Sequence, residues 1–400
     1  MKGEKQMKKL VSYILALCMI LAMFTGCGGN SESSAPESSA PEANAPSENG
    51  DNEDTIKIGM FYEMTGDMAT NGERHYRAAT MVIDDINANG GVLGKQLELV
   101  TADDASTNAG AVTALEIMLA EDVDCLVGPG FSSMALAVAD AIAAEGIPTI
   151  MSGTSLALVE EGMPDNWFRN LPPDDIACQN MADFLVGAKG YSDIFIVYEN
   201  TTFGTGNLKY IQEALAEYGV EIMGSAAFNA GDTDYTAQIM TAQEANPEVV
   251  IFFSASSADA AIIARQVKEL GCEFVVQGSM QFGSGVTKDL AGDAMNGIYA
   301  FQSYNKDSSE LAGEFNAEYE ALYGEPADHF NGWVRDAIYV LCDAMERAGT
   351  TEYEAVVQAL KETEDLPGVC GNMTCDDRNE LQHNVSIVYI ENGEYIVQEF

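Results

Sequence analysis

The chain has 400 residues, 47% of them hydrophobic, and its 63 Asp and Glu against 19 Lys and Arg give a formal net charge of −44. A charge of this sign repels nucleic-acid phosphates and anionic lipid head groups, which excludes nucleic acid and an anionic membrane surface as binding partners. About 345 residues follow Asp54, more than one hydrophobic core usually organises, so we expect two lobes.

The N-terminus has the pattern of an export signal. A lysine-bearing start precedes a mostly apolar run over Leu10–Phe24. A run of about fifteen residues is too short for a membrane-spanning helix, which needs about 20, and small residues follow it. We predict a signal peptide over residues 1–26, with an uncleaved apolar signal anchor as the alternative.

Cys27, preceded by Thr25 and Gly26, resembles the lipobox cysteine of bacterial lipoproteins. In that family the leader is cut just before the cysteine, which then carries lipid. The resemblance implies an exported protein, lipid-anchored through Cys27 to the outer face of the bacterial cytoplasmic membrane, at the cell surface or in the periplasm. If the anchor is uncleaved, the cysteine is incidental.

The segment after the cysteine has the composition of a tether. From Gly28 to Thr55 the chain holds no aromatic residue and no Val, Ile or Leu, and it repeats Ser-Ser-Ala-Pro-Glu. Such a segment cannot bury enough apolar surface to offset the entropy of ordering it. We expect a disordered Ser/Pro/Glu tether over residues 27–54, which would give the body a reach of about 30 Å.

The body alternates short apolar runs with amphipathic runs at helical spacing. In its first half we predict strands over Thr55–Tyr62, Gln96–Thr101, Asp124–Gly128 and Pro148–Ser152, with helices through Tyr76, Ala79, Ile83 and Ile86, over Ala111–Ala120 and over Ser133–Ala144. After Leu171-Pro172-Pro173 a second series has strands over Asp193–Tyr198, Glu221–Phe228, Glu248–Phe253 and Cys272–Val276, with helices over Leu208–Tyr218 and Ala258–Leu270. This alternation predicts an α/β protein of two Rossmann-like lobes with parallel sheets, which bind ligands at the carboxyl ends of their strands.

Two turns at predicted strand ends carry the residues suited to binding. Gly130, Ser132 and Ser133 open an Ala-rich helix after one strand, where hydroxyls and free N–H groups attract an anion such as a carboxylate. The run Ser152–Ser155 follows the next strand. Each turn alone is an ordinary helix N-cap, but two of them on neighbouring strands favour a ligand site.

The cysteines and histidines give no metal pattern. No C-x-x-C pair exists, and the three His residues (His75, His329 and His383) lie far apart in sequence, so we predict no metal site. Cys125, Cys272 and Cys342 belong to apolar runs and are expected as small buried hydrophobes. Cys370 and Cys375 either close a small disulfide loop in an oxidising exterior or are two thiols on one turn.

The body resembles the branched-chain amino acid binding proteins, the leucine-binding type of periplasmic-binding-protein fold (type I) that serves ABC importers. The resemblance covers nearly all of residues 54–400. It is carried by the runs Met64–Gly72, Ile83–Gly94, Asp103-Asp104, Val127–Ser133, Gly146-Ile147-Pro148, Asn246–Val250, Ala344–Thr351 and Leu366–Gly371.

The resemblance implies two lobes joined by a three-crossing hinge and closing over the ligand. The crossings would lie near Leu171–Asp174, Tyr299–Ser303 and Asp376–Gln382. Lobe 1 would then comprise residues 55–171 plus 302–377, and lobe 2 residues 172–301 plus 378–400.

The positions that match the family's ligand-binding residues lie on both lobes. The ligand carboxylate would be held by the two turns, Asn71 would overhang the cleft, and Phe203 would close from the second lobe. With an apolar side-chain pocket, the predicted ligand-binding set is Asn71, Phe131, Ser132, Ser133, Gly153, Thr154, Ser155, Phe203, Met280, Gln281 and Phe330. For Met280, Phe282 and Phe330, core packing is the competing explanation.

One departure from the family concerns the ligand's ammonium group. Leucine-binding members have an acidic residue after the strand that here ends at Val276, whereas this chain has Gly278–Phe282 there, with no carboxylate. A buried ammonium without a partner costs several kcal/mol. Glu63 and Glu199, at the ends of strands, are the candidate partners, although solvated or hinge-facing carboxylates are the more common case.

These observations predict a binding protein rather than an enzyme, because no G-x-S-x-G, H-E-x-x-H, Walker-type or dinucleotide-binding motif is present. We expect a monomeric lipoprotein that captures a small amino acid of apolar, branched-chain type, needs no cofactor, and delivers the ligand to the permease and ATPase subunits of an ABC importer. The alternatives are the same trap for a non-amino-acid carboxylate or amide, and a ligand-sensing receptor ectodomain.

Overall fold

The computed structural model describes residues 55–160, 163–382 and 384–400. The predicted signal peptide, the tether and Cys27 lie outside the described residues. Within them, no helix has the length and apolar character needed to cross a membrane.

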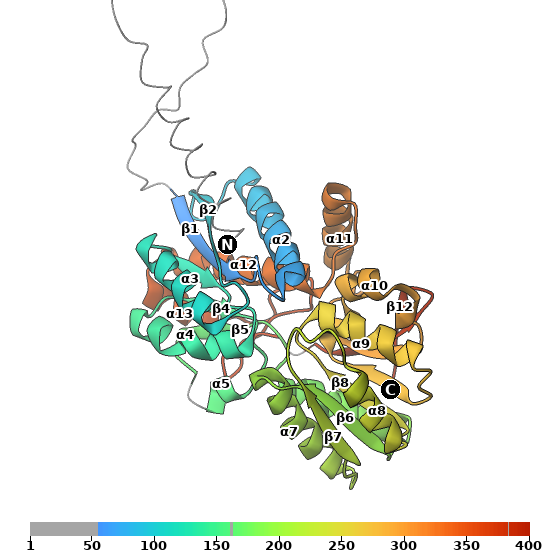
Figure 1. Cartoon of the computed structure of the whole chain (residues 1–400). Coiled ribbons are helices and arrows are strands. Elements are labelled where there is room, and N and C mark those ends of the chain that lie inside the picture. The colour runs from blue at the N-terminus through green and yellow to red at the C-terminus, as the bar shows by residue number, and fades with distance from the viewer. Residues whose placement is uncertain (1–54, 161–162, 383) are drawn as a thin grey trace, which may run out of the picture. The chain divides into compact units, whose positions relative to one another are not determined.

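The first sheet has five strands in the order β2-β1-β3-β4-β5, and all of its pairings are parallel (Figure 1). Its strands are β1 (Thr55–Tyr62), β2 (Gln96–Asp103), β3 (Cys125–Val127), β4 (Thr149–Met151) and β5 (Trp167–Arg169). Alternate β1 side chains pack on opposite faces: Ile56, Ile58 and Met60 join one core and Phe61 another. Both faces of the sheet are therefore covered.

Helices from distant parts of the chain cover these two faces. On one face α2 (Ala69–Ala88) packs against α12 (His329–Ala348), and on the other α3 (Asn108–Ala120) packs against α4 (Ser132–Glu145). The short α5 (Ala157–Glu160) follows β4, whereas α11 (Glu310–Tyr323) and α13 (Tyr353–Lys361) flank α12 in sequence. The C-terminal third of the chain thus returns to complete the first half of the molecule.

The second sheet has seven strands in the order β12-β11-β10-β9-β8-β6-β7. Its strands are β6 (Ile194–Glu199), β7 (Gly224–Phe228), β8 (Val249–Phe253), β9 (Val275–Gly278), β10 (Ile298–Gln302), β11 (Ser386–Glu391) and β12 (Glu394–Val397). The helical segments of this half are α6 (Asp174–Ala182), the π-helix η1 (Asp183–Ala188), α7 (Thr202–Glu217), α8 (Thr236–Glu244), α9 (Ser257–Glu269), α10 (Gly285–Ala291), and the 3₁₀ helices η2 (Met280–Gly283) and η3 (Gly292–Met295).

The α/β architecture with two sheets is confirmed, but the second sheet is not purely parallel. β11 pairs antiparallel with β10 and with β12. Asn392 and Gly393 both have positive φ (54° and 79°) and form the tight turn that joins β11 to β12 as a hairpin. This C-terminal hairpin was not among the predicted strands.

The predicted strands and helices of both series are present, but their ends differ: α7 (Thr202–Glu217) begins six residues before the predicted Leu208, and β9 is shifted as well. It begins at Val275 and not at Cys272, because Gly271 (φ 65°) ends α9 and the Cys272 N–H donates to the Val267 carbonyl. Cys125 and Cys342 are buried, as expected, whereas Cys272 is only partly buried. Cys370 and Cys375 are both free thiols.

The chain passes between the elements of the two sheets at several places. It leaves the first sheet after β5, returns to α11–α13 after β10, and goes back to the second sheet at β11. The first and last of these segments touch, since Arg169 pairs with Glu380 and both side chains are fully buried. The carboxyl ends of the parallel strands of both sheets border one cavity.

Candidate binding cavity at the strand ends

The cavity encloses about 620 Å³ of space between atoms, part of it open to solvent. Segments of both sheets line it: the turns after β3 and β4, the segment after β5, the segments after β8 and β9, and side chains of α2, α6, α7, β10 and α12. The lining residues are His75, Gly130, Phe131, Ser132, Ser152, Gly153, Thr154, Pro172, Asp174, Ala177, Met181, Phe203, Asn207, Phe253, Ala255, Ser279, Met280, Gln281, Phe301, Phe330 and Trp333.

The turn after β3 presents the free N-terminus of α4 to the cavity. Phe131 occupies the N-cap position, and no side chain caps the helix. Ser132 instead accepts a hydrogen bond on Oγ from the Ser155 N–H (3.1 Å), which leaves its O–H available as a donor. The prediction that Ser132 and Ser133 cap the helix is therefore wrong, because the hydroxyl of Ser132 is tied to the second turn.

The turn after β4 packs directly on the first one. A Cβ at Gly153 would lie 3.1 Å from the Ser132 Cα, so only glycine fits there without a shift. Thr154 follows it into the cavity wall with 8% of its surface exposed. Ser155 does not line the cavity: it is buried, and its Oγ accepts from the Ala157 N–H.

Asp174 was missed by the sequence analysis. Among the described residues that line the cavity it carries the only carboxylate, it is 2% exposed, and its Oδ2 makes no hydrogen bond. Burial raises the pKa of its carboxyl to about 6, and the neighbouring Thr154 hydroxyl and Arg169 offset only part of that rise. A partner for the ammonium group was expected only at strand ends, whereas Asp174 opens α6 just after the Pro172-Pro173 pair.

Glu63 and Glu199 do not line the cavity. Both are fully buried, so of the two expected cases, solvated or hinge-facing carboxylates, the solvated one is wrong for both. Glu63 lies behind the cavity wall beside His75. Glu199 accepts a hydrogen bond from the Ala255 N–H (2.8 Å), and burial raises the pKa of its carboxyl to about 7.

The rest of the wall is mainly apolar and aromatic. Phe203, Met280 and Phe330 line the cavity beside Gln281, whereas Phe282 packs on Phe252 in the core of the second sheet. Asn71 lies within α2, fully buried and away from the wall, and Ser133 does not line the cavity either. The sequence analysis did not find Met181, Phe253, Phe301 and Trp333, which sit in runs that look like ordinary core.

Comparison with known proteins identifies the family. The model of the periplasmic binding proteins matches residues 55–394. The chain belongs to this family.

Relatives of this periplasmic binding protein include proteins named for their amino acid ligands. It is 28% identical over 342 residues to the leucine-, isoleucine-, valine-, threonine- and alanine-binding protein of Pseudomonas aeruginosa, which covers 84% of this chain and 90% of that protein. It is 26% identical over 349 residues to a Leu/Ile/Val-binding protein of Rhizobium johnstonii (86% and 94% covered).

Solved structures share the fold. A leucine-binding protein, LivK, from Thermotoga maritima superimposes with a TM-score of 0.79 at 23% identity, covering 86% of this chain and 98% of that one. The branched-chain amino acid binding protein LivJ of Streptococcus pneumoniae in complex with isoleucine gives 0.79 at 24% identity (86% and 99%). A Rhodopseudomonas palustris solute-binding protein in complex with benzoate also gives 0.79, at 19% identity (86% and 95%).

The buried carboxylate of Asp174 predicts a stability cost in this periplasmic binding protein. Its pKa in the folded chain, about 6, lies above the ordinary 3.8, so above pH 6 folding must bury a charge. We expect Asp174→Asn to raise the unfolding free energy of ligand-free protein at pH 7.5 by about 1 to 3 kcal/mol. This gain in stability should vanish as the pH falls from 6 towards 4, since the buried side chain is then neutral in the parent as it is in the variant.

Denaturant unfolding at pH 7.5 and pH 4.5 measures this effect. Asp175→Asn is the control, because Asp175 is the next residue of the same helix but is partly exposed and pairs with Arg378 (3.1 Å). An Asp174→Asn protein that is less stable than the parent at pH 7.5 would contradict the prediction.

Proposed function

We propose that this periplasmic binding protein captures one small α-amino acid with a largely apolar side chain, performs no chemistry on it, and delivers it to an ABC importer. The observation that carries the proposal is the pairing, in one cavity, of an uncapped helix N-terminus with a single buried carboxylate. An anion site facing a cation site matches a zwitterion and neither a simple acid nor a simple amine.

The carboxylate of the ligand would bind at the start of α4. Free N–H groups at a helix N-terminus, with the positive end of the helix dipole, stabilise a negative charge. The O–H of Ser132 is free to donate, and Thr154 on the neighbouring turn adds a second hydroxyl to the wall.

The ammonium group of the ligand would face Asp174. This residue takes the role proposed from sequence for Glu63 and Glu199, whose side chains are occupied or lie behind the wall. Thr154 and Asn207 lie beside the Asp174 carboxyl and offset part of the rise that burial gives its pKa, but Oδ2 makes no hydrogen bond, and an ammonium group would supply a charged donor. The apolar wall and the names of the relatives support a branched-chain or similar side chain.

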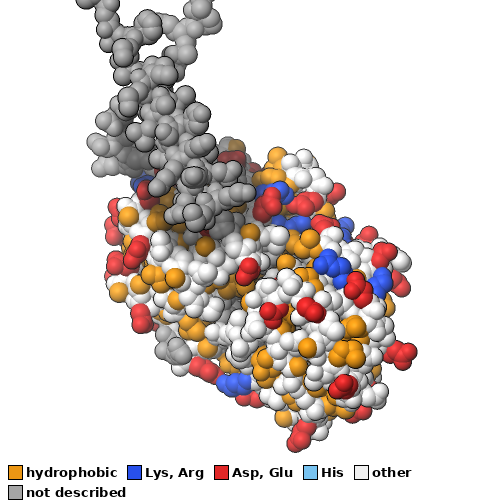
Figure 2. Space-filling view, in the orientation of Figure 1, with side chains coloured by type: hydrophobic (Ala, Val, Ile, Leu, Met, Phe, Trp, Pro, Cys, Tyr) orange, Lys and Arg blue, Asp and Glu red, His pale blue; other side chains and the backbone are white. Residues whose placement is uncertain are grey.

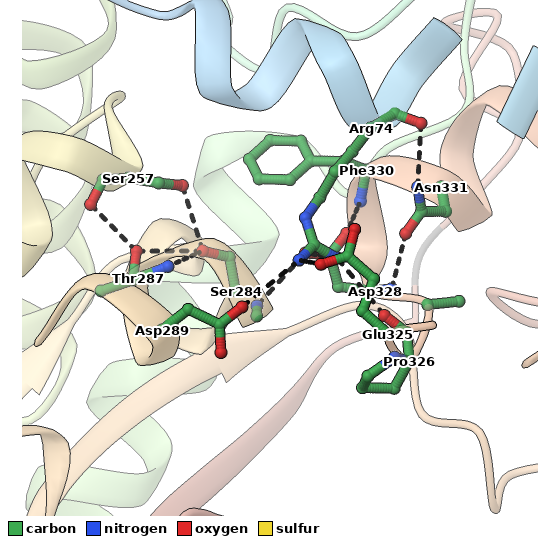
Figure 3. A network of polar contacts seen from close by, with 12 residues as sticks. Arg74, Ser257, Ser284, Thr287, Asp289, Glu325, Pro326, Asp328, Phe330 and Asn331 are labelled. Atoms are coloured by element: carbon green, nitrogen blue, oxygen red, sulfur yellow. Dashed lines mark hydrogen bonds and ion pairs between the residues drawn. The ribbon is translucent and has the colours of Figure 1, made fainter. Parts of the chain in front are cut away.

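Closure of two lobes would complete the trap. Arg74, on α2, contacts Asp289 of α10 (3.8 Å) as well as Glu325 (2.9 Å) and Asp328 (3.4 Å), and these side chains point toward one another in Figure 3. The Gly285 N–H of α10 also donates to Asp328 (3.2 Å). These contacts join α10 to α2 and to the start of α12, which cover the first sheet, and we call them the latch.

The cellular setting of the proposal comes from the sequence. The leader and Cys27 support an exported lipoprotein anchored to the outer face of the cytoplasmic membrane. The binding protein would be a monomer, and its partners would be the permease and ATPase subunits of an importer. The lobes are proposed as residues 55–171 plus 302–377 and residues 172–301 plus 378–400.

Calorimetry on ligand-stripped protein tests the binding function. We expect a single site for an apolar α-amino acid, and Asp174→Asn should weaken it by about 2 to 5 kcal/mol, because the buried ammonium loses its partner. Below pH 6, where Asp174 is protonated, the parent's affinity should fall by about tenfold per pH unit. Asp175→Asn should bind like the parent. Equal binding of leucine and its deaminated analogue 4-methyl-2-oxopentanoate would contradict the ammonium site.

Ser132→Ala tests the carboxylate site. The variant should lose about 1 to 3 kcal/mol of binding free energy, because a charged acceptor in a desolvated site loses a donor. Ser309→Ala is the control: Ser309 caps α11 by accepting from the Ala312 N–H, so its loss should lower stability by about 1 kcal/mol without changing affinity. A Ser132→Ala protein that binds normally but unfolds more easily would show that the hydroxyl is only structural.

Gly285→Leu tests closure. A Cβ at Gly285 would lie 3.4 Å from the Arg74 guanidinium nitrogens and from Asp328, so alanine fits and the larger leucine side chain does not. We expect Gly285→Ala to bind like the parent and Gly285→Leu to bind at least tenfold more weakly. Small-angle scattering should show that ligand compacts the parent and the alanine variant but not the leucine variant. Tight binding by the leucine variant would argue against the latch.

A further inference from the structure

His75 is a polar group in the otherwise aromatic end of the cavity. It projects from α2 and is 2% exposed, and its ring lies tilted against Tyr62 (4.2 Å between ring centroids) and edge to face with Phe330 (5.2 Å). Neither ring nitrogen makes a hydrogen bond, although the ring lines the cavity. An imidazole buried among aromatic rings without a partner loses its hydrogen bonds to water, and no hydrogen bond in the protein compensates for them. Phenylalanine would pack there without that cost.

A buried carboxylate stands behind this imidazole. Oε1 of Glu63, which is fully buried, lies 3.4 Å from Nδ1 of His75, and neither carboxylate oxygen makes a hydrogen bond. A carboxylate at one ring nitrogen fixes the orientation and protonation of an imidazole, as carboxylates do behind the histidines that bind metals. With Nδ1 turned toward Glu63, Nε2 is the buried ring nitrogen that remains without a partner.

The place of His75 separates it from the groups that would hold the amino acid backbone. Ser132 opens α4, which covers one face of the first sheet, and Thr154 lies in the turn after β4, whereas His75 and Phe330 come from α2 and α12 on the opposite face. A side chain that extends from the α-carbon toward α2 and α12 would run along the aromatic wall and end at the imidazole.

We propose that His75 recognises a hydroxyl group on the side chain of the bound amino acid, with Glu63 as the positioning residue. The inference rests on the proposed function and narrows its ligand to a hydroxylated amino acid. A hydroxyl fits because it both donates and accepts: it can donate to Nε2 of a neutral imidazole whose Nδ1–H faces Glu63, or accept from Nε2–H of the protonated ring.

Isosteric ligand pairs test this on the unmodified protein. Threonine has a hydroxyl where valine has a methyl group, and tyrosine has a hydroxyl where phenylalanine has a hydrogen. Calorimetry on the ligand-stripped full chain should give at least tenfold tighter binding of the hydroxylated member of at least one pair, because a site built for a hydroxyl leaves its polar groups unpaired with the other member. Equal or tighter binding of the apolar member in both pairs overturns the inference. If no amino acid binds at all, the proposed function has failed instead.

Variants assign the preference to the imidazole. His75→Phe keeps an aromatic ring and should bring the affinity ratio of the hydroxylated to the apolar member within threefold. Because His75→Phe leaves Glu63 without a partner, the double variant Glu63→Gln/His75→Phe provides the same test without a buried charge. Glu63→Gln alone should lower the ratio of the affinities for the hydroxylated and the apolar ligand while leaving the affinity for the apolar ligand unchanged. Loss of a purely structural contact would not change the two affinities differently.

His329→Phe is the matched control. His329 is also buried with both ring nitrogens unpartnered, but it does not line this cavity. Its replacement should leave the hydroxyl preference intact. A preference that survives in both His75 variants, or that disappears in His329→Phe, overturns the assignment to His75.

Discussion

A fully buried ion pair between Arg169 and Glu380 holds together the segments from which the cavity is built. Arg169 is the last residue of β5, and its Nε donates to Oε2 of Glu380 at 2.6 Å while Nη2 pairs with Oε1. Its Nη1 donates to the carbonyls of Gly153 (3.0 Å) and Ser155 (3.2 Å). Breaking such a pair by removing one partner typically costs about 3 to 5 kcal/mol, because the other charge stays buried.

The geometry of the binding turn follows from this pair. With the carbonyls of Gly153 and Ser155 directed at Arg169, the Thr154 carbonyl is left to accept from the Asp174 N–H (3.1 Å), and the Ser155 N–H is left to donate to Ser132. The two hydroxyl turns and the start of α6 are thereby held as one rigid unit. The positive charge of Arg169 also lowers the pKa of Asp174, which burial alone would raise further. A structural ion pair thus keeps a buried carboxylate ionisable near neutral pH.

The sequence was enough to predict four strands of each sheet, helices between them and the two turns, because each depends on local periodicity and on glycine and hydroxyl residues at strand ends. The remaining strands of the two sheets, β5 and β10–β12, were not predicted. Asp174 could not be found that way. Its importance depends on where the chain crosses between sheets, and Pro172-Pro173 marks a boundary without showing which neighbouring side chain is buried. Glu63 failed for the opposite reason: it ends a strand, as expected of a site residue, but turns behind the wall to His75. His75 itself occupies an ordinary position on an amphipathic helix, and only the approach of α12 places it in an aromatic wall.

The net charge of the chain bears on which ligands this cavity favours. Acidic side chains are spread over the visible face of the described residues (Figure 2), and the formal charge of the whole sequence is −44. The field of such a molecule disfavours the approach of an anion but exerts little net force on a zwitterion. Inside the cavity, the free N-terminus of α4 and the carboxylate of Asp174 offer charges of opposite sign. A bound zwitterion would leave neither charge unmatched. A simple carboxylic acid would face Asp174 with no ammonium group between them. Surface and cavity would therefore disfavour the same class of ligand, simple anions, which supports the proposed amino acid ligand over an aromatic or aliphatic acid.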